Sequence, residues 1–382
     1  MDSKILYRFL SGFILLIFSY CVSPYDVEVV KTDNSFLTVN GFINSKGITE
    51  ITLSRTLNLS DSGKATPESN AQVFIEDEQG EKSSLNETGA GTYLSALLTL
   101  DKTRKYRLSI KTTNGKEYAS DFVPVLETPE IDSISWKVQS DGLQIYVNSH
   151  DTKNATRYYR WDYEDTWEFT SLYNSVLMYV PDTVVTRTDD IYHCWTSDRS
   201  NEIDISNSLK LEQDIISEYP LHFLPSNSVK LRYKYSILVK QYAQSEEEYQ
   251  YWETLQKNTE NIGSMYDPLP SRLLGNIHCL TNPDETVIGF TGAYGVTEKR
   301  IFISNEQLPA EWEYQTGYED CDEPMKMFLS QVMPYIETGQ YIPIYPFFSP
   351  APFFVLQGYY IGTKECTDCR LRGTNVKPTF WQ

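Results

Sequence analysis

Apolar and polar residues alternate in short segments along the first third of the chain. Turn-forming residues separate these segments, and Asn114-Gly115 after the last of them is a strong hairpin signal. Closely spaced strands without a helical period are typical of small antiparallel sandwiches. We therefore predict an Ig-like or transthyretin-like β-sandwich over residues 35–127, with strands at residues 36–43, 48–55, 71–77, 92–98 and 106–112.

The strand pattern resumes after a boundary at Pro124 and Thr128-Pro129. The longest segment, residues 156–169, places Trp161 and Trp167 on one face by its period of two. We predict a larger β-rich domain over residues 128–382, so the fold class is mainly β. Its expected strands are residues 131–138, 143–149, 156–169, 230–242, 275–280, 286–296 and 299–304.

One segment of the second domain has a helical pattern instead. Ser245 and Glu248 form a capping box, and Tyr249, Trp252 and Leu255 follow at helical spacing. Gly263 and the prolines after it end the pattern. The sequence therefore predicts one amphipathic helix at about residues 245–262, which covers a sheet.

The N-terminus has the features of an export signal. Residues 9–20 are almost wholly apolar, Lys4 and Arg8 precede them, and Cys21 follows directly. A run of twelve residues is shorter than the about 20 needed to span a bilayer, and its length and basic flank suit a signal peptide. We predict a signal peptide over residues 1–20, lipidation of Cys21 and a lipid-anchored spacer over 21–34. The alternative is an ordinary cleaved signal peptide with a cysteine there by accident.

Composition narrows the classes of partner. The chain carries 33 basic and 52 acidic residues, a net charge of −19, without any basic stripe. Such a chain repels phosphate backbones, so we expect no nucleic acid partner. The 28 tyrosines, 17 phenylalanines and 7 tryptophans suit half-buried strand faces and wet interfaces.

The cysteines also indicate export. With Cys21 assigned to lipid, five remain, and oxidising compartments favour disulfides. We predict structural pairing among four of them, with Cys279 buried and reduced, and leave the connectivity open. A zinc site would need a second CxxC pair or histidines at ligand spacing, and the chain has neither. A redox CxxC motif would begin a helix after a strand, whereas this one lies near the C-terminus in a segment flanked by Gly and Pro. We therefore assign no metal and no cofactor. The disulfide candidates are Cys194, Cys321, Cys366 and Cys369.

A run of four prolines and six aromatic residues spans residues 341–354. Prolines hold such a segment extended, and exposed aromatic side chains would mark a surface for a ligand or partner. The alternative is a long loop that packs on the sandwich and is held by Cys321 and the CxxC motif. The candidate surface comprises Trp161, Trp167, Tyr341, Tyr345, Phe347, Phe348, Phe353 and Phe354.

Three carboxylates, Asp162, Glu164 and Glu168, share the other face of the segment 156–169. They could bind Ca²⁺ or act in a glycosidase, and the plainer interpretation is a solvated strand face. No nucleotide, zinc protease or serine hydrolase motif occurs in the chain. We therefore assign no catalytic residue.

Several motifs together resemble one known family. They are residues 53–56 (LSRT), 157–169, 193–195 (HCW), 235–271, 275–277 (GNI) and 366–381. On these the chain resembles the lipoprotein family of domain of unknown function 4249, common in Bacteroidota. Its members share a signal peptide and lipid cysteine and are typically encoded beside TonB-dependent outer-membrane receptors. The family has no established catalytic residues.

The resemblance implies an outer-membrane lipoprotein that assists uptake or substrate capture by such a receptor. Its expected partners are the TonB-dependent receptor and, through the lipid anchor, the membrane; the leaflet it faces stays open. The second hypothesis is a structural or adhesive envelope protein. The third is a hydrolase that uses the carboxylates near residues 162–168.

Overall fold

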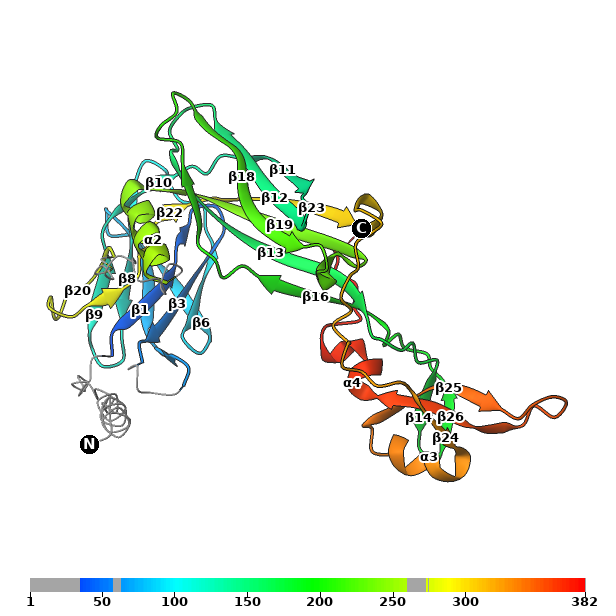
Figure 1. Ribbon diagram of the computed structural model, residues 1–382. Coiled ribbons are helices and arrows are strands. Elements are labelled where there is room, and N and C mark those ends of the chain that lie inside the picture. Colours follow the sequence, from blue (N-terminus) through cyan, green and yellow to red (C-terminus); the bar gives the residue numbers. More distant parts are fainter. Residues whose placement is uncertain (1–34, 58–62, 260–272, 274, 382) are drawn as a thin grey trace, which may run out of the picture.

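The computed structural model describes residues 35–57, 63–259, 273 and 275–381. The fold is mainly β, as predicted. Figure 1 shows three parts in a bent row: an N-terminal sandwich, a middle sandwich and a smaller C-terminal module. The predicted signal peptide, Cys21 and the spacer over 21–34 lie outside the described residues. No described helix is both long enough and apolar enough to cross a membrane.

The N-terminal sandwich contains the strands predicted for the first third of the chain, and the strand 48–55 begins and ends as predicted. Alternate residues point inward, so Leu37, Leu53 and Leu108 are fully buried in one apolar cluster. Antiparallel pairing links most neighbours. The strands are β1 (Leu37–Gly41), β2 (Ile43–Asn44), β3 (Ile48–Arg55), β4 (Thr66–Pro67), β5 (Gln72–Asp77), β6 (Lys82–Gly89), β7 (Thr92–Leu97), β8 (Lys105–Lys111), β9 (Glu117–Ser120) and β10 (Val123–Leu126).

This sandwich is completed by a distant segment of the chain, which differs from the predicted boundary at residue 127. β20 (Ile277–Cys279) pairs with β9, β21 (Val287–Ile288) with β1, and β22 (Ala293–Tyr294) with both β2 and β10. The sequence predicts one strand over residues 286–296, but the structure has two short ones. Gly289 lies between them with a positive φ of 143°, and an added side chain there would meet the backbone of β1.

The middle part is a second sandwich, built from two sheets whose inner faces share one apolar core. The predicted long strand 156–169 is present as β13 (Tyr158–Thr170) and pairs along most of its length with β19 (Lys234–Gln244). The remaining elements are β11 (Ile131–Val138), β12 (Gly142–Asp151), β16 (His193–Arg199), β17 (Asp204–Asn207), β18 (Asp214–Pro225), β23 (Val296–Ser304) and two 3₁₀ turns, η1 (Val229–Leu231) and η2 (Asn305–Gln307).

The predicted helix is α2 (Glu246–Thr259), and the predicted residues 260–262 lie outside the described part. The Ser245 hydroxyl accepts a hydrogen bond from the Glu248 backbone N–H at 3.1 Å, which is the predicted N-cap. Figure 1 shows α2 beside the N-terminal sandwich, although it directly follows β19 of the middle one. The most deeply buried residues of the helix are Glu248 and Tyr251, whereas Trp252 and Leu255 of the predicted stripe are half-buried.

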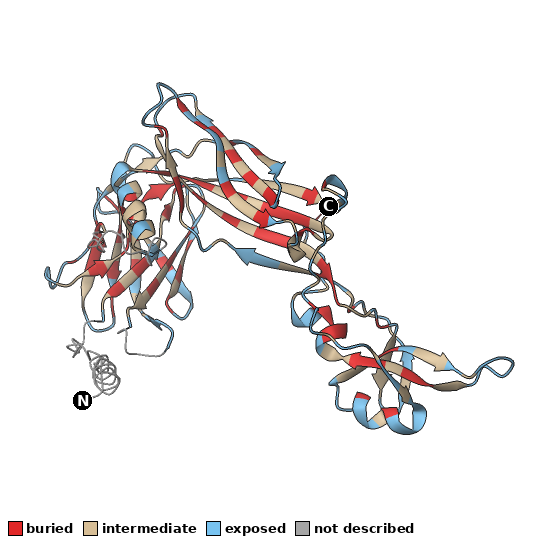
Figure 2. Cartoon of the chain, viewed as in Figure 1, coloured by how far each residue is buried: buried red, intermediate tan, exposed pale blue. Residues whose placement is uncertain are grey.

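The C-terminal module is a third folded part within the predicted domain 128–382. A three-stranded sheet and α3 enclose a small core around Val332 and Ile361, and Figure 2 shows how few buried residues the module contains. The segment 341–348, part of the run that its prolines were predicted to hold extended, is an edge strand. One side of an edge strand has no neighbour in the sheet, so a proline there loses no ladder hydrogen bond. The elements are β14 (Leu177–Val180), β15 (Thr183–Thr186), β24 (Met325–Phe328), α3 (Leu329–Ile336), β25 (Tyr341–Phe348), β26 (Leu356–Thr363), α4 (Lys364–Thr367) and η3 (Cys369–Leu371).

Candidate functional site

Two disulfides tie the C-terminal module to the middle sandwich. Cys194 bonds to Cys369 and Cys321 to Cys366, while Cys279 is free and buried in the N-terminal sandwich. The prediction of disulfides is therefore confirmed, and the structure supplies their connectivity. Both cysteines of the CxxC motif are joined to other cysteines, so each serves a structural bridge.

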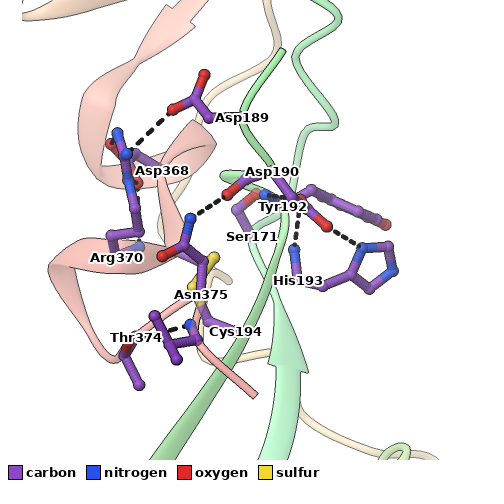
Figure 3. The surroundings of a disulfide bond; sticks show 12 residues. Ser171, Asp189, Asp190, Tyr192, His193, Cys194, Asp368, Arg370, Thr374 and Asn375 are labelled. Atoms are coloured by element: carbon purple, nitrogen blue, oxygen red, sulfur yellow. Dashed lines mark hydrogen bonds and ion pairs between the residues drawn. A yellow bond between two sulfur atoms is a disulfide. The ribbon is translucent and has the colours of Figure 1, made fainter. Parts of the chain in front are cut away.

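Polar contacts surround the Cys194–Cys369 bridge (Figure 3). The Arg370 guanidinium donates to Asp368 at 2.8 Å and to Asp189 at 3.1 Å, and the Asn375 side-chain amide donates to the Asp190 carbonyl at 2.7 Å. Burial raises the pKa of Asp368, but the hydrogen bonds from Arg370 outweigh it and leave the pKa below its ordinary value. The C-terminal segment is thus held on β16 by covalent, ionic and hydrogen bonds together.

The predicted aromatic surface has its centre in the C-terminal module. We call residues 341–363 the aromatic hairpin: it comprises β25, its connecting loop and β26, and contains no charged residue. At its tip, Phe353 is 80% and Phe354 68% exposed. Behind the tip, the rings of Tyr345 and Tyr360 lie 4.7 Å apart between centroids. An exposed apolar tip on a ring-packed base is typical of a surface that contacts a partner.

The structure brings six of the eight predicted surface residues together and separates the other two from them. Trp161 is fully buried in the middle sandwich, where its indole N–H donates to the Gln241 side chain at 2.9 Å. Its assignment to a binding surface is therefore wrong, because the inward face of β13 packs on the facing sheet. Trp167 is half-buried under the Lys230 ammonium, 4.8 Å from the ring centroid. The residues of the hairpin are Tyr341, Tyr345, Phe347, Phe348, Phe353 and Phe354.

Two of the three carboxylates proposed for a hydrolase lie close to arginines. Asp162 accepts from Arg160 at 2.8 Å, and Glu164 lies 3.5 Å from Arg199. Among the described residues, no group of three or more His, Cys, Asp or Glu side chains could hold a metal ion. Paired carboxylates on a strand face agree with the plainer interpretation of a solvated surface.

A different carboxylate of the same strand is buried. Asp165 is 1% exposed, accepts from Lys230 at 2.7 Å and from the Tyr235 hydroxyl, and lies 3.4 Å from His222. Burial raises the pKa of Asp165, but His222 and Lys230 outweigh it and hold the pKa below its ordinary value. We interpret this cluster as a buried ion pair of the middle sandwich.

A cleft of about 1250 Å³ lies between the N-terminal and middle sandwiches. The outward side chains of β1 and β3 form one wall, and those of β13, β19 and β23 form the other, with α2 also lining it. The sequence analysis missed this cleft, because its lining comes from segments more than 100 residues apart. The only signal for the cleft in the sequence was that the alternate, outward-facing residues of these strands are polar. Hydroxyl and amide groups of the first wall come from Thr38, Asn40, Thr52 and Ser54.

Arg160 occupies a central position in the second wall. Its guanidinium lies over the Tyr242 and Trp252 rings, 4.3 and 4.7 Å from their centroids, and donates to Asp162. Its Nε is buried and has no hydrogen-bond partner among the described residues. Burial lowers the pKa of Arg160, but Asp162 and nearby groups outweigh it, so the side chain stays charged.

Glu248 projects from the first turn of α2 into the same region. It is 2% exposed and accepts a hydrogen bond from the Tyr294 hydroxyl at 2.9 Å. Burial raises the pKa of Glu248 to about 7, against the lowering effect of Arg160 and of hydrogen bonds. The capping box predicted the position of this residue, but burial of its side chain depends on β22, which the sequence did not place there.

Comparison with known proteins gives a family but no activity. No curated protein matches the chain. A two-domain fibronectin type III segment of chicken tenascin is similar over 55% of this chain and 92% of its own, at 10% identity and a TM-score of 0.16. A likeness this distant adds nothing to the architecture seen directly.

One family model matches residues 22–300, a range that ends within β23 of the middle sandwich and before β24 of the C-terminal module. The match covers well over half of the chain. The protein therefore belongs to the family described as Domain of unknown function (DUF4249).

Proposed function

We propose that this protein is an outer-membrane lipoprotein, anchored through an acylated Cys21, that assists a TonB-dependent transporter in substrate capture. The aromatic hairpin is the surface that docks on the transporter. The observation that carries the proposal is the exposure of this hairpin: Phe348, Phe353 and Phe354 are 50%, 80% and 68% exposed on a segment without charge. Monomeric proteins rarely keep such a patch uncovered.

Two further observations support export and docking. Disulfides persist in oxidising compartments, and both bridges lie where the module joins the middle sandwich. These bridges hold the hairpin on a fixed base, which lowers the entropic cost of binding a partner. The hydrolase hypothesis gains no support, because Asp162 and Glu164 are paired with arginines.

The test is co-purification of the tagged full chain from its native host in gentle detergent. We expect the neighbouring TonB-dependent receptor to co-purify with the wild type, and to be lost from a Phe353→Ser/Phe354→Ser variant. Leu97→Ser is the matched control, because Leu97 is 77% exposed on the N-terminal sandwich. Mass spectrometry of the processed N-terminus should find an acylated Cys21.

Two results would contradict the proposal: a wild-type protein that purifies alone, or a double phenylalanine variant that retains the receptor. In either case an altered surface attachment of a deletion strain, with normal uptake, would favour the structural or adhesive alternative.

A further inference from the structure

The interdomain cleft has the size and position of a ligand site. Ligand pockets occur preferentially at domain interfaces and measure about 300–1000 Å³ for drug-sized molecules. At about 1250 Å³ this cleft is larger, so it could hold a short oligomer. It is distinct from the aromatic hairpin, whose residues take no part in its lining.

The charges that line the cleft do not cancel. Its three cations are each close to a carboxylate that also lines it: Arg160 to Asp162 at 2.8 Å, Arg199 to Glu164 at 3.5 Å, and Lys240 to Glu298 at 3.6 Å. Three other carboxylates remain, those of Glu50, Glu202 and Glu248. An excess of one sign in a cleft concentrates ligands of the opposite sign.

Two of these remaining carboxylates are accessible to a ligand. Glu50 and Glu202 are exposed, and neither has an ion-pair or hydrogen-bond partner for its side chain among the described residues. They can therefore accept charge-assisted hydrogen bonds from an ammonium or guanidinium group without breaking an existing pair. Glu248 is buried and bonded to Tyr294, so it is not available for direct contact with a ligand.

The deeper part of the cleft offers a donor instead. The Arg160 side chain is 11% exposed, and its Nε lacks an acceptor in the described structure. This Nε is itself buried, so the exposed part of the guanidinium is what can donate to a ligand carbonyl or carboxylate. The guanidinium lies over the Tyr242 and Trp252 rings, which restrict its orientation. The site therefore combines the Arg160 donor with two accessible carboxylates that can bind a cationic group.

The remaining lining suits a peptide backbone. Thr38, Asn40, Thr52 and Ser54 present hydroxyl and amide groups from β1 and β3, which can both donate and accept. Ile48 is 53% exposed at the cleft and offers an aliphatic contact. We propose that the cleft binds short oligopeptides of net positive charge. Their cationic groups contact Glu50 and Glu202, and a carbonyl or carboxylate contacts Arg160.

Other ligand classes agree less well with the same groups. A neutral oligosaccharide would leave the two exposed carboxylates without a counter-charge, and the rings of Tyr242 and Trp252 already stack on Arg160. An acidic peptide would be repelled by the exposed carboxylates of Glu50 and Glu202. A simple polyamine would satisfy the carboxylates but not the Arg160 donor. These three classes serve as comparison ligands in the test.

The experiment is isothermal titration of the full mature chain, in detergent at 0.15 M salt, with tri-lysine as the probe. Spermidine has the same net charge of +3 but no peptide groups; maltotriose and tri-glutamate represent the neutral and acidic classes. We expect tri-lysine to bind more tightly than all three. We expect Glu50→Gln/Glu202→Gln to weaken the binding of tri-lysine at least tenfold.

The matched control is Glu78→Gln/Glu313→Gln, which removes the same charge from two exposed positions outside the cleft. It should leave the affinity within twofold. Three outcomes would overturn the proposal: no binding of tri-lysine, equal losses in the control variant, or spermidine binding as tight as tri-lysine. A Phe353→Ser/Phe354→Ser variant should still bind the peptide, which separates this test from that of the receptor.

Discussion

The N-terminal sandwich and the C-terminal module differ in what holds them together. The sandwich buries seventeen apolar residues in one cluster, whereas the cluster of the module contains four. The sandwich keeps its only cysteine within the described residues reduced, while both disulfides join the segments at the base of the module. A domain with a large core is stable without covalent links, whereas a small one generally needs them.

The same contrast assigns different tasks to the two regions. Apolar side chains of the sandwich point inward, and its outward hydroxyl groups line the cleft. The module exposes several of its largest apolar side chains at the hairpin tip instead. A part that keeps apolar surface for a partner has less of it for its own core, and the disulfides offset that loss.

The largest expected effect follows from removing the bridge between Cys194 and Cys369. The two cysteines are 175 positions apart, and the loss of so long a crosslink costs roughly 4–5 kcal/mol in the free energy of unfolding. In a Cys194→Ser/Cys369→Ser variant we expect limited proteolysis to cut the module first, with the N-terminal sandwich intact. Cys279→Ser is the control, because it removes a free thiol; early cleavage within residues 35–126 would contradict the comparison.

A pair of core truncations tests the same difference without substituting any cysteine. Ile361 in the module and Leu108 in the sandwich are both fully buried, so truncation of either to alanine costs about 2–5 kcal/mol. We expect Ile361→Ala to remove hydrogen-exchange protection from β26, because a module with so small a core has a low free energy of local unfolding. Leu108→Ala should leave β8 protected. Equal behaviour of the two strands would show that core size does not separate the regions.

The sequence predicted the features of the fold that depend only on neighbouring residues. The strand over residues 48–55 begins and ends as expected, and Ser245 caps α2, because period-two alternation and capping depend on neighbouring residues. A strand pattern, however, specifies which face is buried and not which strand lies beside it. The return of residues 277–294 to the N-terminal sandwich, and with it the cleft, could not be read from any single segment.

The predicted site shows the same limit at single residues. Trp161 and Trp167 alternate with the charged residues of β13 as expected, yet Trp161 is in the core and Trp167 is half-buried. The hairpin aromatics were found because prolines and aromatic rings concentrate in one run. Glu248 and Arg160 are ordinary charged residues in sequence, and their burial arises only from contacts between distant elements.

The pH dependence of stability distinguishes the cleft from the covalently tied module. The pKa of Glu248 is 4.5 in the unfolded chain and is raised to about 7 by burial. Between these values the folded protein keeps a proton that the unfolded chain loses, so this residue makes stability fall as pH rises, by about 3 kcal/mol in total. The contribution is fully present below pH 4.5 and is lost above about pH 7.

Urea unfolding of the wild type and of Glu248→Gln, at pH 4.5 and pH 8, measures this contribution. Arg160 and Tyr294, which face Glu248, stay charged and neutral respectively over this range, and the other titrating groups are common to both proteins. In the wild type, Glu248 lowers the free energy of unfolding as the pH rises, and we expect Glu248→Gln to lack this contribution. The stability of the variant relative to the wild type should therefore be higher at pH 8 than at pH 4.5. An unchanged difference between the two pH values would contradict the burial of a titrating carboxylate beside the cleft.

The smallest effect on stability is expected at the tip of the aromatic hairpin. Phe353 and Phe354 are mostly exposed, so their replacement by serine removes little apolar contact and should change the free energy of unfolding by less than about 0.5 kcal/mol. Thermal melting and hydrogen exchange of β26 in Phe353→Ser/Phe354→Ser measure this directly, with Ile361→Ala as the comparison. If the double variant destabilised the module as Ile361→Ala does, the tip would belong to the core. If it left the module unchanged while abolishing co-purification of the receptor, the same aromatic run would serve stability at its base and binding at its tip.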